Sequence, residues 1–156
     1  MRVERGLYRL RNFPASPRED VVARWLKAGQ PIDGVISHES AAELHGLTDI
    51  IPRALHLTVP RRYRGWRAPP GVRFHLTAAD VPAKERVQLD GLPATTVERT
   101  IVDLLAANGQ TEQVELAIAQ ARQRGITTRR RLEAVAAKRP KAVKARLSDA
   151  MERAGL

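Results

Sequence analysis

The sequence predicts an α+β fold, with a small antiparallel sheet covered by helices and a helical C-terminal half. Two segments, LHLTVP at 55–60 and VRFHLT at 72–77, alternate apolar and polar residues. From residue 95 onward, apolar residues instead recur every three or four positions, in segments separated by Gly or Pro. Alternation is typical of a half-buried strand, and the longer period is typical of an amphipathic helix. Strands therefore precede helices along the chain, which is the α+β order.

The N-terminal segment is expected to hold one strand and one helix. Residues 2–10, RVERGLYRL, alternate charged and apolar residues around Gly6, as the last strand of a small hairpin does. A helix is predicted over residues 17–28. Ser16 is placed to cap it, and Glu19 completes a capping box.

The middle of the chain is expected to supply the sheet. A short apolar step at 34–37 leads into a helix over residues 39–45, which Ser37 is placed to cap. Strands 55–60 and 72–77 are predicted to be antiparallel neighbours joined by an Arg-rich loop. Their apolar residues would point inward and the alternate residues outward, namely His56, Thr58, Arg73, His75 and Thr77. A further short strand is predicted near residues 86–89, followed by a turn at Asp90-Gly91.

Four helices are predicted in the C-terminal half. Thr95 and Glu98 form a capping box at the start of the first, and Thr111 is placed to cap the second. Either Thr127 or Thr128 caps the third. Pro140 separates the third helix from the last.

Composition excludes several classes of protein. The 156 residues predict one domain, with the possibility of an appendage. The chain has no Cys, which removes disulfides, thiolate catalysis and Cys-ligated zinc. No apolar run approaches the length of a membrane span, and no signal peptide pattern is present. A soluble cytoplasmic protein without membrane partners is therefore expected.

Positive charge is concentrated in two segments. The formal net charge is +10. Residues 50–79 contain six Arg and no acidic residue, and residues 122–146 contain ten Lys or Arg against Glu133 alone. Such clusters indicate a polyanionic partner, although a solvated face that keeps the protein soluble would read the same way.

A search for catalytic chemistry finds no coherent active site. His56 and His75 are expected to face each other across the two strands, where they could bind a metal or simply be solvated. The Glu-x-Lys pattern of metal-dependent nucleases is absent, as are a Gly-rich phosphate loop and a Gly-x-Ser-x-Gly elbow. Asp103 and Glu98 lie on one predicted helix. A helix cap and a salt bridge account for these two carboxylates without catalysis. We therefore expect no catalytic residues, no metal and no cofactor.

The Arg-rich loop PRRYRGWR is the first candidate for nucleic-acid binding. Its guanidinium groups could contact phosphates, and its rings could stack on bases. Equally, Trp66 could pack back on the sheet while the Arg side chains are solvated. Arg129, Arg130 and Arg131 come near a helix N-terminus, where cations oppose the helix dipole. That placement hints at an anion nearby, although solvation would also suffice.

Three motifs together resemble a known family. They are Ser-His-x-Ser-Ala-Ala with Leu-His-Gly-Leu over residues 37–47, Thr-Val-Pro at 58–60, and Pro-x-Thr-Thr-x-x-Arg-Thr-x-x-Asp-Leu over residues 93–104. Their order and spacing resemble the actinobacterial form of the AbiEi-family antitoxins of type IV toxin–antitoxin systems. In that family, a winged-helix DNA-binding domain precedes the antitoxin domain, and its wing ends in a sequence like Arg-Gly-Leu-Tyr-Arg-Leu. The resemblance thus implies that residues 1–14 are a remnant of the wing, and that residues 15–156 are the antitoxin domain.

The resemblance also implies a function and its partners. Such proteins repress their own operon by binding promoter repeats, and they counteract a nucleotidyltransferase-like toxin without stable direct binding. Without the recognition helix, sequence-specific reading of DNA by this chain alone is doubtful, and contacts to the DNA backbone are expected. The residues expected to make them are Arg9, Arg11, Arg61, Arg62, Arg64, Trp66, Arg67, Arg129, Arg130, Arg131, Lys141 and Lys144. The alternatives are a metal-dependent nuclease-like enzyme and a protein-interaction module.

Overall fold

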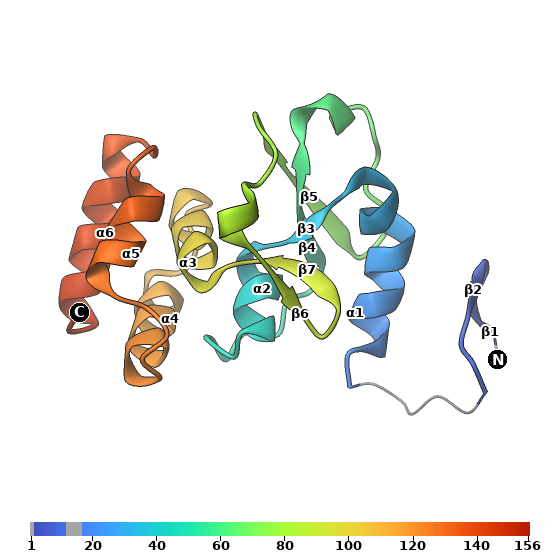
Figure 1. Ribbon diagram of the computed structural model, residues 1–156, viewed down its shortest axis with the longest axis horizontal. Coiled ribbons are helices and arrows are strands. Elements are labelled where there is room, and N and C mark those ends of the chain that lie inside the picture. The colour runs from blue at the N-terminus through green and yellow to red at the C-terminus, as the bar shows by residue number, and fades with distance from the viewer. Residues whose placement is uncertain (1, 12–16) are drawn as a thin grey trace.

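A mixed five-stranded sheet lies at the centre of the molecule (Figure 1). The structure is a computed structural model that describes residues 2–11 and 17–156. The strand order is β5-β4-β3-β7-β6. Strand β3 is antiparallel to β4 and parallel to β7, and β6 and β7 form an antiparallel hairpin. The strands are β3 (Val35–Ile36), β4 (Leu55–Pro60), β5 (Val72–Thr77), β6 (Arg86–Leu89) and β7 (Leu92–Thr95).

The predicted antiparallel sheet is wrong because β4 and β5 run parallel. Their register extends from Leu55 opposite Val72 to Pro60 opposite Thr77. Residues 61–71 carry the chain back to the start of the sheet, so the Arg-rich loop is a crossover and not a hairpin turn. Alternation of side chains is the same in both directions, so the sequence pattern does not specify direction. The predicted strand and turn at 86–91 are confirmed, with positive φ at Asp90 and Gly91.

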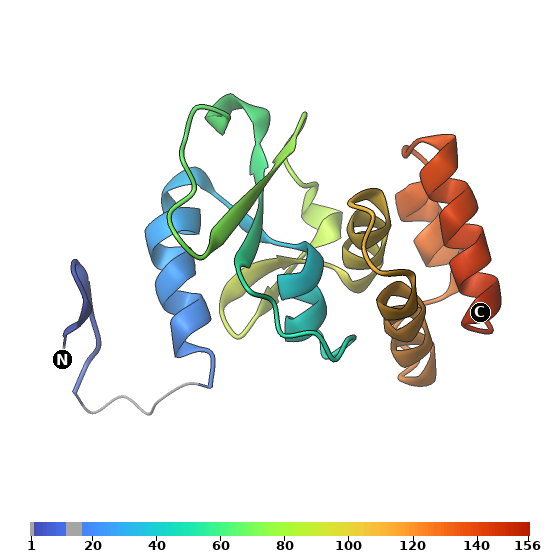
Figure 2. The same ribbon diagram turned by 180° about the vertical axis from the view of Figure 1, so that it is seen from behind.

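Helices cover both faces of the sheet. On one side lies α1 (Glu19–Arg24), which continues as a π-helical turn over Trp25–Gly29 and packs its apolar residues against the sheet. On the other side lies α2 (His38–Leu44), which contacts β4. Figure 2 shows the same order of layers from behind. The predicted cap Ser16 lies outside the described residues, and Arg18 holds the N-cap position of α1 without a side-chain bond.

The four predicted C-terminal helices are confirmed. They are α3 (Val97–Ala106), α4 (Thr111–Gln123), α5 (Arg129–Ala136) and α6 (Lys141–Arg153). They share one apolar core, which also includes Ala42 and Leu47 from the region of α2. Among the described residues, none of the helices combines the length and apolar character that crossing a membrane would need.

Several predicted helix caps are corrected by one residue or more. The cap of α3 is Thr96, whose side chain accepts a bond from the Arg99 amide, whereas Thr95 belongs to β7. Gln110, not Thr111, holds the N-cap position of α4 and makes no side-chain bond. Of the two alternatives for α5, Thr128 is the cap. Ser37 stands at the N-cap of α2, but its hydroxyl bonds to other side chains and not to the helix amides.

The N-terminal segment is a small hairpin and not a single strand. Strand β1 (Arg2–Glu4) pairs antiparallel with β2 (Leu7–Tyr8). Gly6 lies in the turn between them with φ of +82°, a conformation that costs little only for glycine. The prediction of one strand over residues 2–10 is therefore wrong, because the segment supplies its own partner. Arg9 ties the hairpin to α1 through an ion pair with Glu19 at 2.8 Å.

Candidate functional site

The Arg-rich loop between β4 and β5 presents free cations to solvent. Arg61, Arg64 and Arg67 are exposed and form no ion pair within the described part of the chain. Arg62 is also exposed, but it forms an ion pair with Asp80 at 2.9 Å. The loop can therefore offer three uncommitted guanidinium groups to an anion.

The two aromatic residues of the loop behave differently from each other. Tyr63 is half-buried and packs against the apolar core of the sheet, with Arg62 above its ring at 5.0 Å. Trp66 is 52% exposed and contacts the Tyr63 ring edge-on, with 5.5 Å between ring centroids. Trp66 thus packs on the loop itself and leaves much of its ring open to solvent.

The second basic segment lies on α5 and α6. Arg130, Lys141 and Lys144 are exposed and have no ion pair with another described residue. Arg129 forms a longer ion pair with Glu133, at 3.7 Å on the same helix. Their helices, α5 and α6, lie together at the C-terminal end of the molecule (Figure 1), and the exposed surface of these two helices is called the α5–α6 face below.

The anion expected beside the RRR segment is part of the protein itself. Arg131 Nε lies 3.0 Å from Oε1 of Glu98, whose side chain is only 5% exposed. The Thr127 hydroxyl donates to the same carboxylate at 2.9 Å. Glu98 therefore compensates Arg131 and Glu133 pairs with Arg129, whereas Arg130 forms no ion pair with a described residue.

The predicted DNA-binding residues do not converge on one surface. The α5–α6 face lies at one end of the long axis, and the N-terminal hairpin lies at the other (Figures 1 and 2). Arg11 is exposed, whereas Arg9 is engaged with Glu19. The structure thus separates the twelve residues into the hairpin, the Arg-rich loop and the α5–α6 face.

A polar cavity of about 260 Å³ lies where the end of β5 meets α3. Sequence reasoning did not find it, because its lining comes from five separate segments of the chain. The lining residues are His38, Thr58, His75, Leu76, Thr77, Arg99, Asp103, Ala106, Ala107 and Arg139. Two guanidinium groups, two imidazoles and two hydroxyls therefore surround one space.

A chain of hydroxyls sets the tautomer of His38. The Thr58 hydroxyl donates to Ser37 Oγ at 2.7 Å, and Ser37 Oγ lies 2.8 Å from His38 Nδ1. Ser37 is fully buried, so its own hydrogen must go to the imidazole, and Nδ1 is the acceptor. The neutral ring of His38 then carries its proton on Nε2. His38 also has a φ of +53°, which is uncommon for a residue other than glycine.

Three imidazoles pack together above β4 and β5. The rings of His38 and His75 stack with centroids 3.6 Å apart, and His56 Nδ1 lies 2.9 Å from His75 Nε2. Burial, together with the neighbouring imidazoles, lowers the pKa of His38 to about 2 and that of His75 to about 4. Burial also lowers the pKa of His56, against the opposing effect of Glu39. All three rings are therefore neutral at pH 7.

The position of these histidines corrects an expectation. His56 and Thr58 were expected on a solvated face, yet both are buried beneath α2. The predicted facing of His56 and His75 is confirmed. Within the described residues, no group of three or more His, Asp or Glu side chains is arranged to hold a metal ion.

A network of charges closes the cavity on the α3 side. Arg99 Nε donates to both oxygens of Asp103 at 2.9 Å, and its Nη1 donates to Glu85 at 2.6 Å. Arg139 Nη2 donates to the same Asp103 carboxylate at 2.7 Å. Burial raises the pKa of Asp103, and the two guanidinium groups act against that shift. Two cations and two carboxylates thus balance each other around the cavity.

Most of the chain matches one known protein family. Residues 34–153 match the family described as the AbiEi antitoxin C-terminal domain. The chain belongs to this family. The match begins just before β3 and ends with α6, so it includes the whole sheet, the cavity and all four C-terminal helices.

A solved structure shares the fold of this AbiEi domain. The crystal structure of the Rv2827c protein from Mycobacterium tuberculosis superposes with a TM-score of 0.64 at 17% sequence identity. The superposition covers 91% of this chain and 55% of the Rv2827c chain. No match was found among curated proteins.

Several residues of the motifs by which the sequence resembles AbiEi antitoxins belong to the buried network. Ser37 and His38 come from the first motif, and Arg99 and Asp103 come from the last. In the AbiEi domain these motifs meet across the boundary between the sheet and α3. The motif spacing was the available signal, but the sequence does not say that the two motifs share one cavity.

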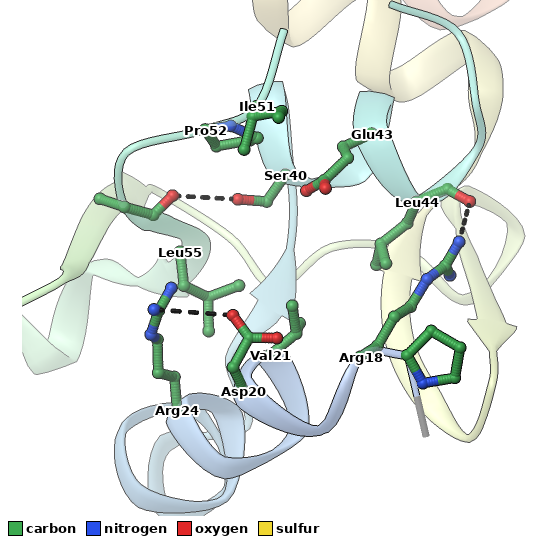
Figure 3. A pocket seen from close by; sticks show the side chains of 12 residues that line it. Arg18, Asp20, Val21, Arg24, Ser40, Glu43, Leu44, Ile51, Pro52 and Leu55 are labelled. Atoms are coloured by element: carbon green, nitrogen blue, oxygen red, sulfur yellow. Dashed lines mark hydrogen bonds and ion pairs between the residues drawn. The ribbon is translucent and has the colours of Figure 1, made fainter. Parts of the chain in front are cut away.

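A second, smaller cavity of about 100 Å³ lies between α1, α2 and the segment before β4 (Figure 3). Three of its four charged side chains, those of Arg18, Asp20 and Arg24, are already engaged with protein partners, and the fourth is Glu43. Arg18 donates to the Leu44 carbonyl at 3.3 Å, and Asp20 lies 3.6 Å from Arg24. The cavity therefore offers less unsatisfied hydrogen-bonding capacity than the one beside α3.

Proposed function

We propose that this chain is the antitoxin of a type IV toxin–antitoxin system and an autoregulator that contacts the DNA backbone. The observation that carries the antitoxin role is membership of the AbiEi antitoxin C-terminal domain family over residues 34–153. The partner is then a nucleotidyltransferase-like toxin, which the antitoxin counteracts without a stable complex.

The proposed contact with DNA is supported by charge that the fold leaves uncompensated. In the Arg-rich loop and on the α5–α6 face, six cations are exposed and unpaired among the described residues: Arg61, Arg64, Arg67, Arg130, Lys141 and Lys144. Phosphate contacts give affinity without sequence information. Binding by this chain alone is accordingly expected to be weak, insensitive to sequence and strongly dependent on salt.

Co-expression with the cognate toxin tests the antitoxin role. Cells that express the cognate nucleotidyltransferase-like toxin should stop growing, and induction of this chain should restore growth. A pull-down in the same strain should recover no stable complex. Growth arrest that persists despite soluble expression of this chain would contradict the antitoxin role.

A salt titration tests the contact with DNA. Replacing Arg61, Arg64 and Arg67 by Ala should reduce the slope of log K against log salt concentration by up to about 0.9 for each phosphate that the variant no longer neutralises. A matched triple variant of Arg53, Lys84 and Arg122 removes three exposed cations that lie outside the Arg-rich loop and outside α5 and α6, and it should leave most of the slope unchanged. Equal slopes for the two variants would exclude the loop as a specific contact surface.

A further inference from the structure

The cavity beside α3 presents hydrogen-bond donors that the protein does not use. Arg99 is only 8% exposed, and its Nε and Nη1 bond to Asp103 and Glu85. Its Nη2 bonds to no described residue, yet this atom is not sealed from solvent. Because Arg99 lines the cavity and its other donors are engaged, we infer that Nη2 faces that space.

His38 supplies a second unused donor. Its Nδ1 accepts from Ser37, so the proton lies on Nε2, and Nε2 has no partner among the described residues. The side chain is 7% exposed and lines the same cavity. A neutral imidazole that donates from a buried position is thus available beside the guanidinium group of Arg99.

The two carboxylates beside the cavity already accept hydrogen bonds from guanidinium groups. Asp103 accepts from Arg99 and from Arg139, and Glu85 accepts from Arg99. Arg139 uses one N–H on Asp103 and keeps its remaining donors at the rim, where it is 27% exposed. The free groups of Arg99, His38 and Arg139 are therefore all hydrogen-bond donors. A ligand that matches them must carry hydrogen-bond acceptors.

We propose that this cavity binds a phosphoryl group, whose oxygens accept from Arg99 Nη2, His38 Nε2 and Arg139. Guanidinium groups bind phosphate through short, charge-assisted hydrogen bonds. The cavity volume of about 260 Å³ equals that of several water molecules at about 30 Å³ each, which is room for a phosphate. Free phosphate and the terminal phosphate of a small nucleotide share this chemistry.

Thermal unfolding in phosphate tests the site. With a Kd of about 1 mM, 20 mM inorganic phosphate should raise the Tm by about 5 °C above that in chloride at equal ionic strength. Arg139→Gln should lose most of that increase, whereas Arg53→Gln, which removes an exposed cation outside both the cavity and the proposed DNA contacts, should keep it. A nucleoside 5′-monophosphate that binds at least tenfold more tightly than phosphate would assign the site to nucleotides, and equal affinity would assign it to free phosphate.

A second measurement needs no variant. In NMR spectra of the wild-type protein, phosphate should shift the side-chain N–H signals of His38 and Arg99. No stabilisation beyond that in chloride, or shifts confined to the Arg-rich loop, would overturn the proposal. Both measurements use the isolated protein and do not depend on toxin or DNA, so failure here leaves the proposed antitoxin function untouched.

Discussion

The sheet half and the helical half of this molecule bury different chemistry. The helical half, α3 to α6, packs around an apolar core that includes Ile101, Ile118 and Leu147. The sheet half has an apolar cluster around Leu57 and Val59 together with a buried polar layer of Ser, Thr and His between β4 and α2. An apolar core depends little on pH, whereas neutral buried imidazoles make folding depend on it. The two halves should therefore respond differently to mutation and to acid.

The largest effect is expected where the two halves meet, at Asp103. Asp103→Ala would leave the guanidinium groups of Arg99 and Arg139 without their shared carboxylate. Removing one partner from a buried charge network costs about 3–5 kcal/mol. Urea unfolding measures the loss, and Asp103→Asn, which keeps one acceptor, should lose less. Equal and small losses for the two variants would show that the network contributes little.

The helical core should respond as ordinary apolar packing does. Leu132 is fully buried in the core of α3 to α6, and Leu132→Ala should cost about 3 kcal/mol through reduced burial and a residual cavity. The neighbouring exposed Arg130→Ala should change the free energy of unfolding by less than about 0.5 kcal/mol. A loss at Leu132 as small as that at Arg130 would contradict the packing described for α5.

Acid should destabilise the protein through the sheet half. His38 and His75 have folded pKa values of about 2 and about 4, below the unfolded value of 6.5. The unfolded chain binds more protons, so their stabilisation is full above pH 6.5 and is lost as pH falls below it. Between pH 8 and pH 5.5 the loss should be about 2.5 kcal/mol for the two groups together.

Urea unfolding at several pH values checks the acid dependence. The variant His75→Gln should remove about one proton from the uptake on unfolding between pH 5 and pH 6. Stability that is constant from pH 8 to pH 5.5 would mean that the two imidazoles are solvated in the folded protein.

The smallest effect concerns the start of α3. Thr96→Ala should cost about 1 kcal/mol, because the Thr96 side chain accepts from the Arg99 amide. At Thr95, the position that the sequence favoured as the cap, Thr95→Ser keeps the hydroxyl that bonds to Thr100 and tests only the methyl group. A denaturant midpoint that Thr96→Ala leaves unchanged would contradict the assignment of the cap to Thr96.

The same contrast explains what the sequence could predict. The four C-terminal helices were predicted because helical periodicity, Gly and Pro mark each one locally. The exposed cations of the Arg-rich loop were also predicted, since a turn-rich basic segment seldom becomes buried. Caps moved by one residue at Thr95 and Thr96 because adjacent threonines give the same local signal.

The sheet half was harder to predict because its determinants are not local. Strands β4 and β5 alternate in the same way whether they run parallel or antiparallel. The side chains of His56 and Thr58 were predicted to face solvent, because polar residues at alternate strand positions normally face water. Only the packing of α2 and α3 on that face makes it a buried network, and that packing is a tertiary fact. The cavity beside α3 was missed for the same reason.

The protonation state of the three histidines tests this contrast most directly. Long-range ¹H–¹⁵N NMR spectra recorded from pH 7.5 to pH 5 would report the charge and the tautomer of each imidazole. The structure predicts that His38 stays neutral throughout, with its proton on Nε2, and that His75 also stays neutral down to pH 5. A folded protein in which His38 titrates near pH 6.5, or carries its proton on Nδ1, would contradict the buried polar layer described here.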